Sequence, residues 1–198
     1  MAKVVKFPIQ PPEKFGFRRV RQKREAPQKR SSQLNLFTGG KVVKLNQLSP
    51  FDEALLLDES NDKSAKEHYL KAIKEGDSIA DAYCNLGIIE SKLRNYPKAI
   101  DCFTLSLKED PRHFESHYNL ANLYAEINNL PLAKMHYQIS IQIEPDFPNS
   151  YFNLGLTFAM NQEIDDAINT LLEYKRLTTA EEHAQVNELI EYLTRATK

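Results

Sequence analysis

Residues able to do chemistry are scattered along this chain, and none of them falls into a catalytic motif. The histidines are His68, His113, His117, His136 and His183. They form no His-Glu-x-x-His pair and no nucleophile arrangement. Gly39-Gly40 is an isolated pair rather than a phosphate loop, and Asp165-Asp166 fits a solvated turn. We therefore expect a chain that is not an enzyme and that needs no metal or other cofactor.

The cysteines and the hydropathy pattern bear on where the chain works. Cys84 and Cys102 have no histidine at ligand spacing, which is typical of free packing thiols in a reducing compartment. No stretch reaches the ~18 apolar residues of a membrane helix, and the first residues lack the apolar run of a secretory signal. We expect a cytoplasmic protein that does not contact a membrane.

The net charge of −1 hides a strong asymmetry between the two ends of the chain. Residues 1–45 hold 12 Lys and Arg but only Glu13 and Glu25, which gives a charge of +10. Residues 46–198 carry a charge of −11. This split predicts a basic arm attached to an acidic body.

The body repeats one pattern in three consecutive stretches of 34 residues, which start at Ala80, Phe114 and Pro148. Similar residues return at matching places in each stretch. These places are Tyr83/His117/Tyr151, Leu86/Leu120/Leu154, Gly87/Ala121/Gly155, Ala99/Ala133/Ala167 and Phe103/Tyr137/Leu171. Apolar positions recur at intervals of three and four, so each stretch is predicted to form two helices separated by a polar turn.

The period and the matching residues resemble the tetratricopeptide repeat. Pro97 and Pro131 suit the first turn of a second helix, where the missing N–H is not needed. Small residues such as Gly87 and Ala99 would let the two helices of a pair approach closely. The resemblance implies an all-α fold, a right-handed superhelical solenoid of antiparallel helix pairs.

The same pattern divides the whole chain. We expect, in order, a disordered basic arm at 1–45, a partial repeat at 46–79, repeats at 80–113, 114–147 and 148–181, and a C-terminal cap helix at 182–198. The last segment places Val186, Leu189, Ile190 and Leu193 on one apolar face. That face either closes the stack of helices or mediates dimerisation.

According to the resemblance, the first helix of each repeat lines a concave groove that holds a peptide or a helix of another protein. The groove residues implied are Asp81, Cys84, Asn85, Ile88, Glu115, Tyr118, Asn119, Asn122, Phe152, Asn153 and Leu156. The function predicted from this family is a non-enzymatic scaffold for protein–protein interaction.

Asparagine returns once per repeat in this groove, at Asn85, Asn119 and Asn153. Its carboxamide either bonds the backbone of an extended ligand or has a structural role alone. Some family members capture a C-terminal carboxylate with Lys or Arg, but no groove position here is Lys or Arg. Asp81 and Glu115 instead favour a neutral or basic ligand.

The basic arm suggests two further functions. Its densest run contains Arg18, Arg19, Arg21, Lys23 and Arg24. Such a run can contact the phosphates of nucleic acid through counterion release. Alternatively, the arm folds onto the acidic groove and regulates the protein's own binding.

A short apolar motif lies within the arm, at Gln33, Leu34, Leu36 and Phe37. Together with Asn35 it resembles the pentapeptide that docks bacterial replication and repair proteins on the sliding clamp. The resemblance implies that Leu36 and Phe37 enter an apolar pocket, while Gln33 bonds at its rim. The alternative function is therefore an adaptor that joins the clamp, or nucleic acid, to the partner in the groove.

Overall fold

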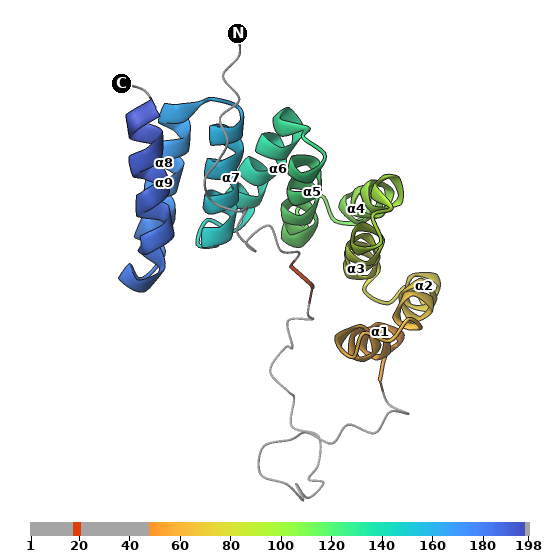
Figure 1. Cartoon of the computed structure of the whole chain (residues 1–198). Helices are drawn as coiled ribbons and strands as arrows, with labels where there is room; N and C mark the ends of the chain where they lie inside the picture. Colours follow the sequence, from red (N-terminus) through yellow and green to blue (C-terminus); the bar gives the residue numbers. More distant parts are fainter. Residues whose placement is uncertain (1–17, 21–47, 197–198) are drawn as a thin grey trace, which may run out of the picture. The chain divides into compact units, whose positions relative to one another are not determined.

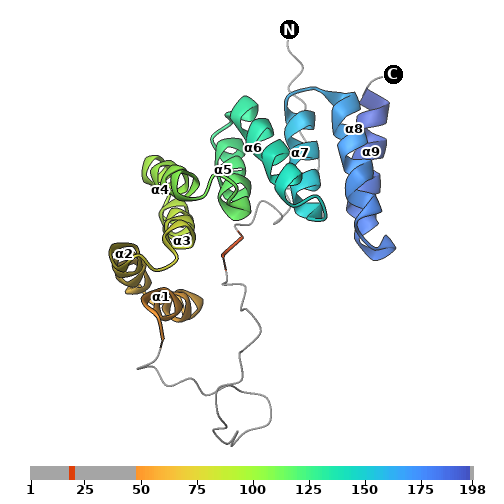
Figure 2. The same ribbon diagram turned by 180° about the vertical axis from the view of Figure 1, so that it is seen from behind.

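The computed structural model describes residues 18–20 and 48–196, and in this part every regular element is helical. The helices are α1 (Pro50–Glu59), α2 (Ala65–Glu75), α3 (Ile79–Lys92), α4 (Tyr96–Glu109), α5 (Phe114–Glu126), α6 (Leu130–Ile143), α7 (Pro148–Met160), α8 (Ile164–Arg176), the 3-10 turn η3 (Ala180–Glu182) and α9 (His183–Ala196). Helices α1 and α2, α3 and α4, α5 and α6, and α7 and α8 pack as pairs (Figures 1 and 2). The expected all-α fold of paired helices is confirmed.

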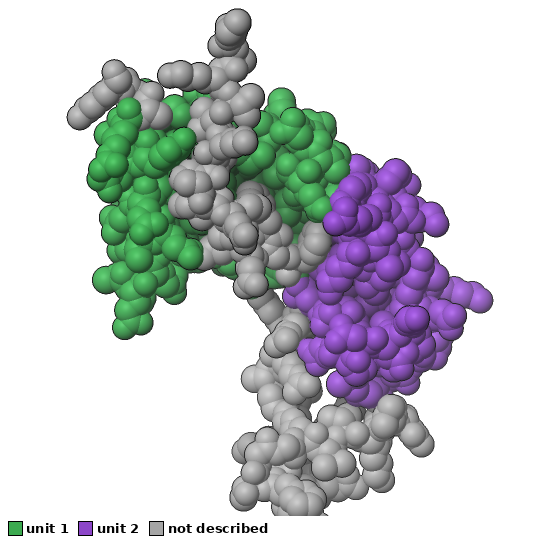
Figure 3. Space-filling model, viewed as in Figure 1, with its two compact units in different colours: residues 1–18, 112–198 green, residues 19–111 purple. Residues whose placement is uncertain are grey.

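The chain forms two compact units, which Figure 3 shows in different colours. Unit 2 comprises residues 19–111 and contains helices α1 to α4. Unit 1 comprises residues 112–198, with helices α5 to α9, and it also includes Arg18 of the arm. No helix in the described part of the chain is long and apolar enough to cross a membrane.

Unit 2 begins at a capped helix. Ser49 is the N-cap of α1, and its hydroxyl accepts a hydrogen bond of 3.2 Å from the backbone N–H of Asp52. The core of the unit buries Phe51 and Tyr69, whose rings lie 5.8 Å apart, together with Leu86 of α3. Burial of these three side chains holds α1, α2 and α3 together.

The close approach of paired helices depends on glycine in both units. A Cβ atom at Gly87 in α3 would lie 2.7 Å from the ring of Phe103 in α4. In unit 1, a Cβ at Gly155 in α7 would lie 2.8 Å from Leu171 in α8. The expected close packing is present, but a large side chain on the second helix, rather than the small Ala99 or Ala167, is what excludes a Cβ.

Unit 1 ends with α9 packed on α8. Val186, Leu189 and Leu193 of α9 are buried in one cluster with Leu171 and Tyr174 of α8. Tyr174 also donates a hydrogen bond of 3.2 Å to Glu182 in η3. The apolar face predicted for the last helix therefore closes the core of this unit.

Candidate peptide-binding site

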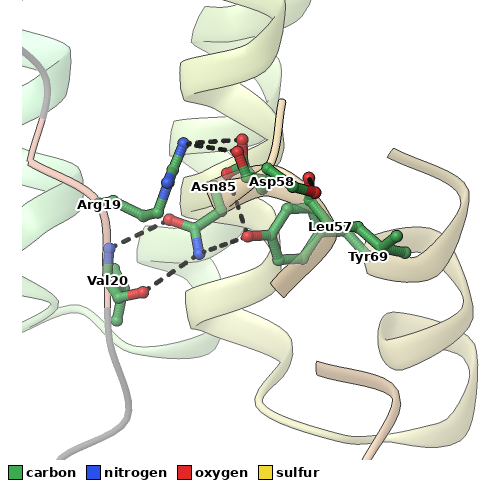
Figure 4. A network of polar contacts seen from close by, with 7 residues as sticks. Arg19, Val20, Leu57, Asp58, Tyr69 and Asn85 are labelled. Atoms are coloured by element: carbon green, nitrogen blue, oxygen red, sulfur yellow. Dashed lines mark hydrogen bonds and ion pairs between the residues drawn. The ribbon is translucent and has the colours of Figure 1, made fainter. Parts of the chain in front are cut away.

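In unit 2, Asn85 of α3 holds the backbone of one residue of the arm. Its Oδ1 accepts a 3.1 Å hydrogen bond from the N–H of Val20, and its Nδ2 donates to the carbonyl of Val20 at 3.3 Å (Figure 4). Nδ2 also donates to the hydroxyl of Tyr69 at 3.1 Å. Asn85 is completely buried and Val20 is 5% exposed, so this pairing is shielded from water.

The arginine next to Val20 is held by a buried carboxylate. Nη2 of Arg19 lies 2.7 Å from Oδ1 of Asp58, near the end of α1 (Figure 4). The hydroxyl of Tyr69 donates to the other carboxylate oxygen of Asp58 at 3.2 Å. Burial and the charge of Asp58 raise the pKa of Tyr69 well above its usual range. Tyr69 therefore remains a protonated donor, and it orients Asp58 towards Arg19.

In unit 1, Asn119 of α5 holds Arg18 in the same way. Its Oδ1 accepts from the N–H of Arg18 at 2.8 Å, and its Nδ2 donates to the carbonyl of Arg18 at 2.9 Å. The guanidinium of Arg18 lies against two aromatic rings, with Cζ 4.5 Å from the centroid of Phe147 and 5.1 Å from that of Phe114. Oε1 of Glu115 lies 3.7 Å from Nε of Arg18.

Both contacts imitate the pairing of β-strands. A carboxamide offers one acceptor and one donor side by side, and a residue in an extended chain presents its N–H and C=O in matching order. Each asparagine pairs with the backbone of one arm residue, Asn85 with Val20 in unit 2 and Asn119 with Arg18 in unit 1. Asn85 and Asn119 stand 34 residues apart at the same position of consecutive repeats.

The third asparagine of the row takes part in a network of side chains. Asn153 of α7 donates to the hydroxyl of Tyr118 at 3.1 Å and to Oδ1 of Asn122 at 3.0 Å. The hydroxyl of Tyr137 donates to the same Oδ1 at 2.5 Å. Burial raises the pKa of Tyr118 to about 12, so its hydroxyl stays neutral.

The remaining predicted groove residues divide by burial. Cys84, Ile88 and Phe152 are buried, whereas Asp81 and Leu156 are half-buried. Cys84 and Cys102 are free thiols, and burial raises the pKa of Cys102 to about 11. Within the described residues, no cluster of His, Cys, Asp or Glu could hold a metal ion.

Sequence reasoning missed the residues that contact the arginine side chains. Asp58 and Tyr69 lie in the partial repeat at 46–79, whereas all the predicted groove residues lie in the three repeats that follow it. The signal was a carboxylate directly after the apolar run Leu55-Leu56-Leu57. Phe114 and Phe147 stand at the first and last positions of one 34-residue stretch, outside the groove positions of the template.

The arm and its linear motif are described only in part. Arg18 and Arg19, two predicted nucleic-acid contacts, face the carboxylates of Glu115 and Asp58. Arg21, Lys23 and Arg24 lie outside the described residues, as does the motif at 33–37. The three described residues of the arm have no helix or strand.

Comparison with known families identifies the repeats. Two family models described as tetratricopeptide repeat match this chain, one over residues 80–113 and the other over residues 102–135. Residues 80–135 are therefore tetratricopeptide repeats, as their resemblance implied. A search of curated proteins finds no match to this sequence.

Solved structures share the fold at low sequence identity. MamA, residues 41 to the end, from Desulfovibrio magneticus RS-1 has a TM-score of 0.66 and 16% identity, covering 75% of this chain and 83% of MamA. YrrB, described as a TPR protein with an unusual peptide-binding site, has a TM-score of 0.65 and 20% identity. The match covers 75% of this chain and 76% of YrrB. The first TPR of Spaghetti (RPAP3), bound to the HSP90 peptide SRMEEVD, has a TM-score of 0.55 and 18% identity. The match covers 60% of this chain and 92% of the RPAP3 chain.

Proposed function

We propose that this chain is a protein-interaction scaffold whose repeated asparagines bind the backbone of an extended, basic peptide. We further propose that its own residues 18–20 occupy these positions until a partner displaces them. The observation that carries the proposal is the paired hydrogen bonding of Asn85 with Val20 and of Asn119 with Arg18. This pairing does not depend on the ligand's side chains, so a second peptide can use it.

Charge supports a basic ligand. Asp58 and Glu115 each face one arginine of the arm, and no Lys or Arg stands among the predicted groove residues. The structural neighbours support peptide binding in general, since the first TPR of RPAP3 was solved with an HSP90 peptide and TPR2B of yeast Sti1 with a pHsp70 complex. The HSP90 peptide SRMEEVD is rich in acidic residues, and so the ligand proposed here differs from it in charge.

Because the arm occupies the asparagine positions, it competes with a partner's peptide and so regulates the binding of that peptide. A tethered ligand competes at an effective concentration on the order of 1 mM when its linker is short and flexible. If the segment binds with a Kd of about 10 μM, the tethered arm weakens the binding of a free peptide about 100-fold. A partner must therefore bind more tightly than the arm, be present in excess, or itself bind the arm.

A labelled peptide tests this proposal in the full chain. The peptide carries residues 12–26, and the open chain is the full chain with Arg18→Gly, Arg19→Ser and Val20→Gly in its own arm. We expect the peptide to bind the open chain with micromolar affinity in fluorescence anisotropy and the wild-type chain at least about tenfold more weakly. Asn85→Ala in the open chain is expected to weaken the peptide strongly.

The matched control is Asn169→Ala, which removes an exposed carboxamide of α8 and is expected to leave binding unchanged. Peptide that fails to bind the open chain, or that binds it no better than the wild-type chain, would contradict the proposal.

A further inference from the structure

The guanidinium of Arg18 lies in a corner formed by two aromatic rings of unit 1. The rings of Phe114 and Phe147 are nearly perpendicular, at 82°, with centroids 5.0 Å apart. The ring of Tyr118 packs edge-on against that of Phe147, with centroids 5.2 Å apart and an interplanar angle of 86°, and this contact supports the Phe147 ring. The Cζ atom of Arg18 lies within 5.1 Å of both phenylalanine centroids, close enough for a cation–π interaction with each ring.

The charge partner in this corner is distant. Oε1 of Glu115 lies 3.7 Å from Nε of Arg18, beyond the range of a good hydrogen bond, and the Arg18 side chain is 43% exposed. Position along the chain comes from Asn119, which pairs with the backbone of Arg18. The guanidinium is thus held by ring faces and by the field of Glu115, without the direct 2.7 Å contact that Asp58 gives Arg19.

We infer that the corner formed by Phe114, Phe147 and Glu115 is an arginine-selective subsite, and that the natural partner inserts an arginine where Arg18 now lies. The inference rests on the proposed function, because it assigns a side-chain preference to the same binding site. A guanidinium is flat, delocalised and weakly hydrated, so it stacks on aromatic rings at little desolvation cost. The ammonium of lysine is a strongly hydrated point charge and gains less from the same faces.

The same reasoning extends to modified arginine. Methylation of a guanidinium keeps its positive charge but removes N–H donors and blocks bidentate hydrogen bonding. The corner recognises charge and flat apolar surface, so it accepts dimethylarginine. In the Arg19 subsite of unit 2, one nitrogen, Nη2, bonds both Oδ1 and the backbone carbonyl of Asp58, so methyl groups on that nitrogen remove both contacts.

Peptides with single replacements test the inference on the unchanged open chain. The probes are the peptide of residues 12–26 and versions that carry lysine, dimethylarginine or citrulline in place of Arg18. Lysine is expected to weaken binding about 5- to 10-fold and neutral citrulline at least as much, from the size of cation–π interactions. Dimethylarginine is expected to stay within about 3-fold of arginine. The same replacements at Arg24 are the charge-matched control and are expected to change affinity less.

A substitution at Phe147 distinguishes the contribution of the aromatic ring face from that of apolar packing in general. Phe147→Leu keeps an apolar side chain at the start of α7 but removes one π face. We expect it to bring the arginine peptide down to the affinity of the lysine peptide while the lysine peptide changes little. Phe158→Leu, within α7 and outside the corner, serves as the control and is expected to preserve the preference for arginine.

The outcomes separate this inference from the proposed function. If the unmodified peptide fails to bind the open chain, the proposed function itself is wrong. If it binds but lysine at position 18 binds equally well, or Phe147→Leu weakens both peptides equally, the scaffold stands and the arginine-selective subsite is overturned.

Discussion

Each of the two units contacts the arm through an asparagine at the same position of its repeat, but the residues around that asparagine differ. In unit 2, Asn85 is accompanied by the buried carboxylate of Asp58, which contacts Arg19 directly at 2.7 Å. In unit 1, Asn119 is accompanied by aromatic faces and by the more exposed Glu115, 3.7 Å from Arg18. The residue that repeats binds the backbone, and the residues that differ between repeats bind the side chains. In the proposed function, the repeated asparagine supplies affinity for an extended segment, and the residues that differ between repeats supply selectivity.

The largest loss of peptide affinity is expected from a substitution that removes the direct ion pair between Asp58 and Arg19 in unit 2. Asp58→Asn removes the charge that faces Arg19 while it preserves the shape of the side chain. Hydrogen bonds to charged groups contribute about 1.5–3 kcal/mol, so the peptide of residues 12–26 should bind the open chain about 10- to 100-fold more weakly. Anisotropy titration measures this loss. A change below about threefold would show that the buried carboxylate does not select the ligand.

The second largest effect is expected on the stability of two helix pairs, each of which packs closely at its own glycine. Gly87→Ala forces a Cβ against the ring of Phe103, and overpacking of this kind costs about 1–3 kcal/mol. Native-state hydrogen exchange should show faster opening of α3 and α4. Gly155→Ala should instead affect α7 and α8, where the added Cβ meets Leu171. Equal loss of protection in both units from either variant would contradict this separation.

The effect of pH should also distinguish the units. His136 in unit 1 is buried, and its Nδ1 lies 2.9 Å from Nδ1 of His117. Burial, and then the neighbouring His117, lower the pKa of His136 to about 4. The unfolded chain binds a proton near pH 6.5 that the folded chain does not take up until about pH 4, so stability falls as pH drops through this window.

Thermal unfolding of the wild type and of His136→Gln at pH 7 and pH 5 measures this effect. We expect a loss of about 1 kcal/mol in the wild type that His136→Gln does not show, after discounting for partial solvent access. An equal loss in both proteins would assign the pH dependence to other groups.

The smallest expected effect is at the distant carboxylate of unit 1. Glu115→Gln should weaken the peptide by about 0.2–1 kcal/mol, or less than about fivefold, because the pair is long and partly exposed to solvent. The same titration as for Asp58→Asn measures it. A loss as large as that of Asp58→Asn would mean that Glu115, and not the aromatic corner, holds Arg18.

The features that recur in every repeat could be predicted from the sequence, because each recurrence at the 34-residue interval supports the same assignment. Paired helices, the small residue at Gly87 and the asparagine row all recur at 34-residue intervals, and the cap helix shows a clear apolar face. Asp58 and Phe147 occur once each, so no pattern marked them. The contact of Arg18 with Phe147 joins positions far apart in the sequence, and only the fold brings these positions together.

Hydrogen exchange at the arm tests the central claim most directly. We would measure, by NMR, the exchange of the amide protons of Arg18 and Val20 in the full chain. The account predicts that both are protected, that Asn119→Ala releases Arg18, and that Asn85→Ala releases Val20. Exchange of both amides at the rate of an unstructured peptide in the wild type would contradict it, because the asparagines would then not hold the arm.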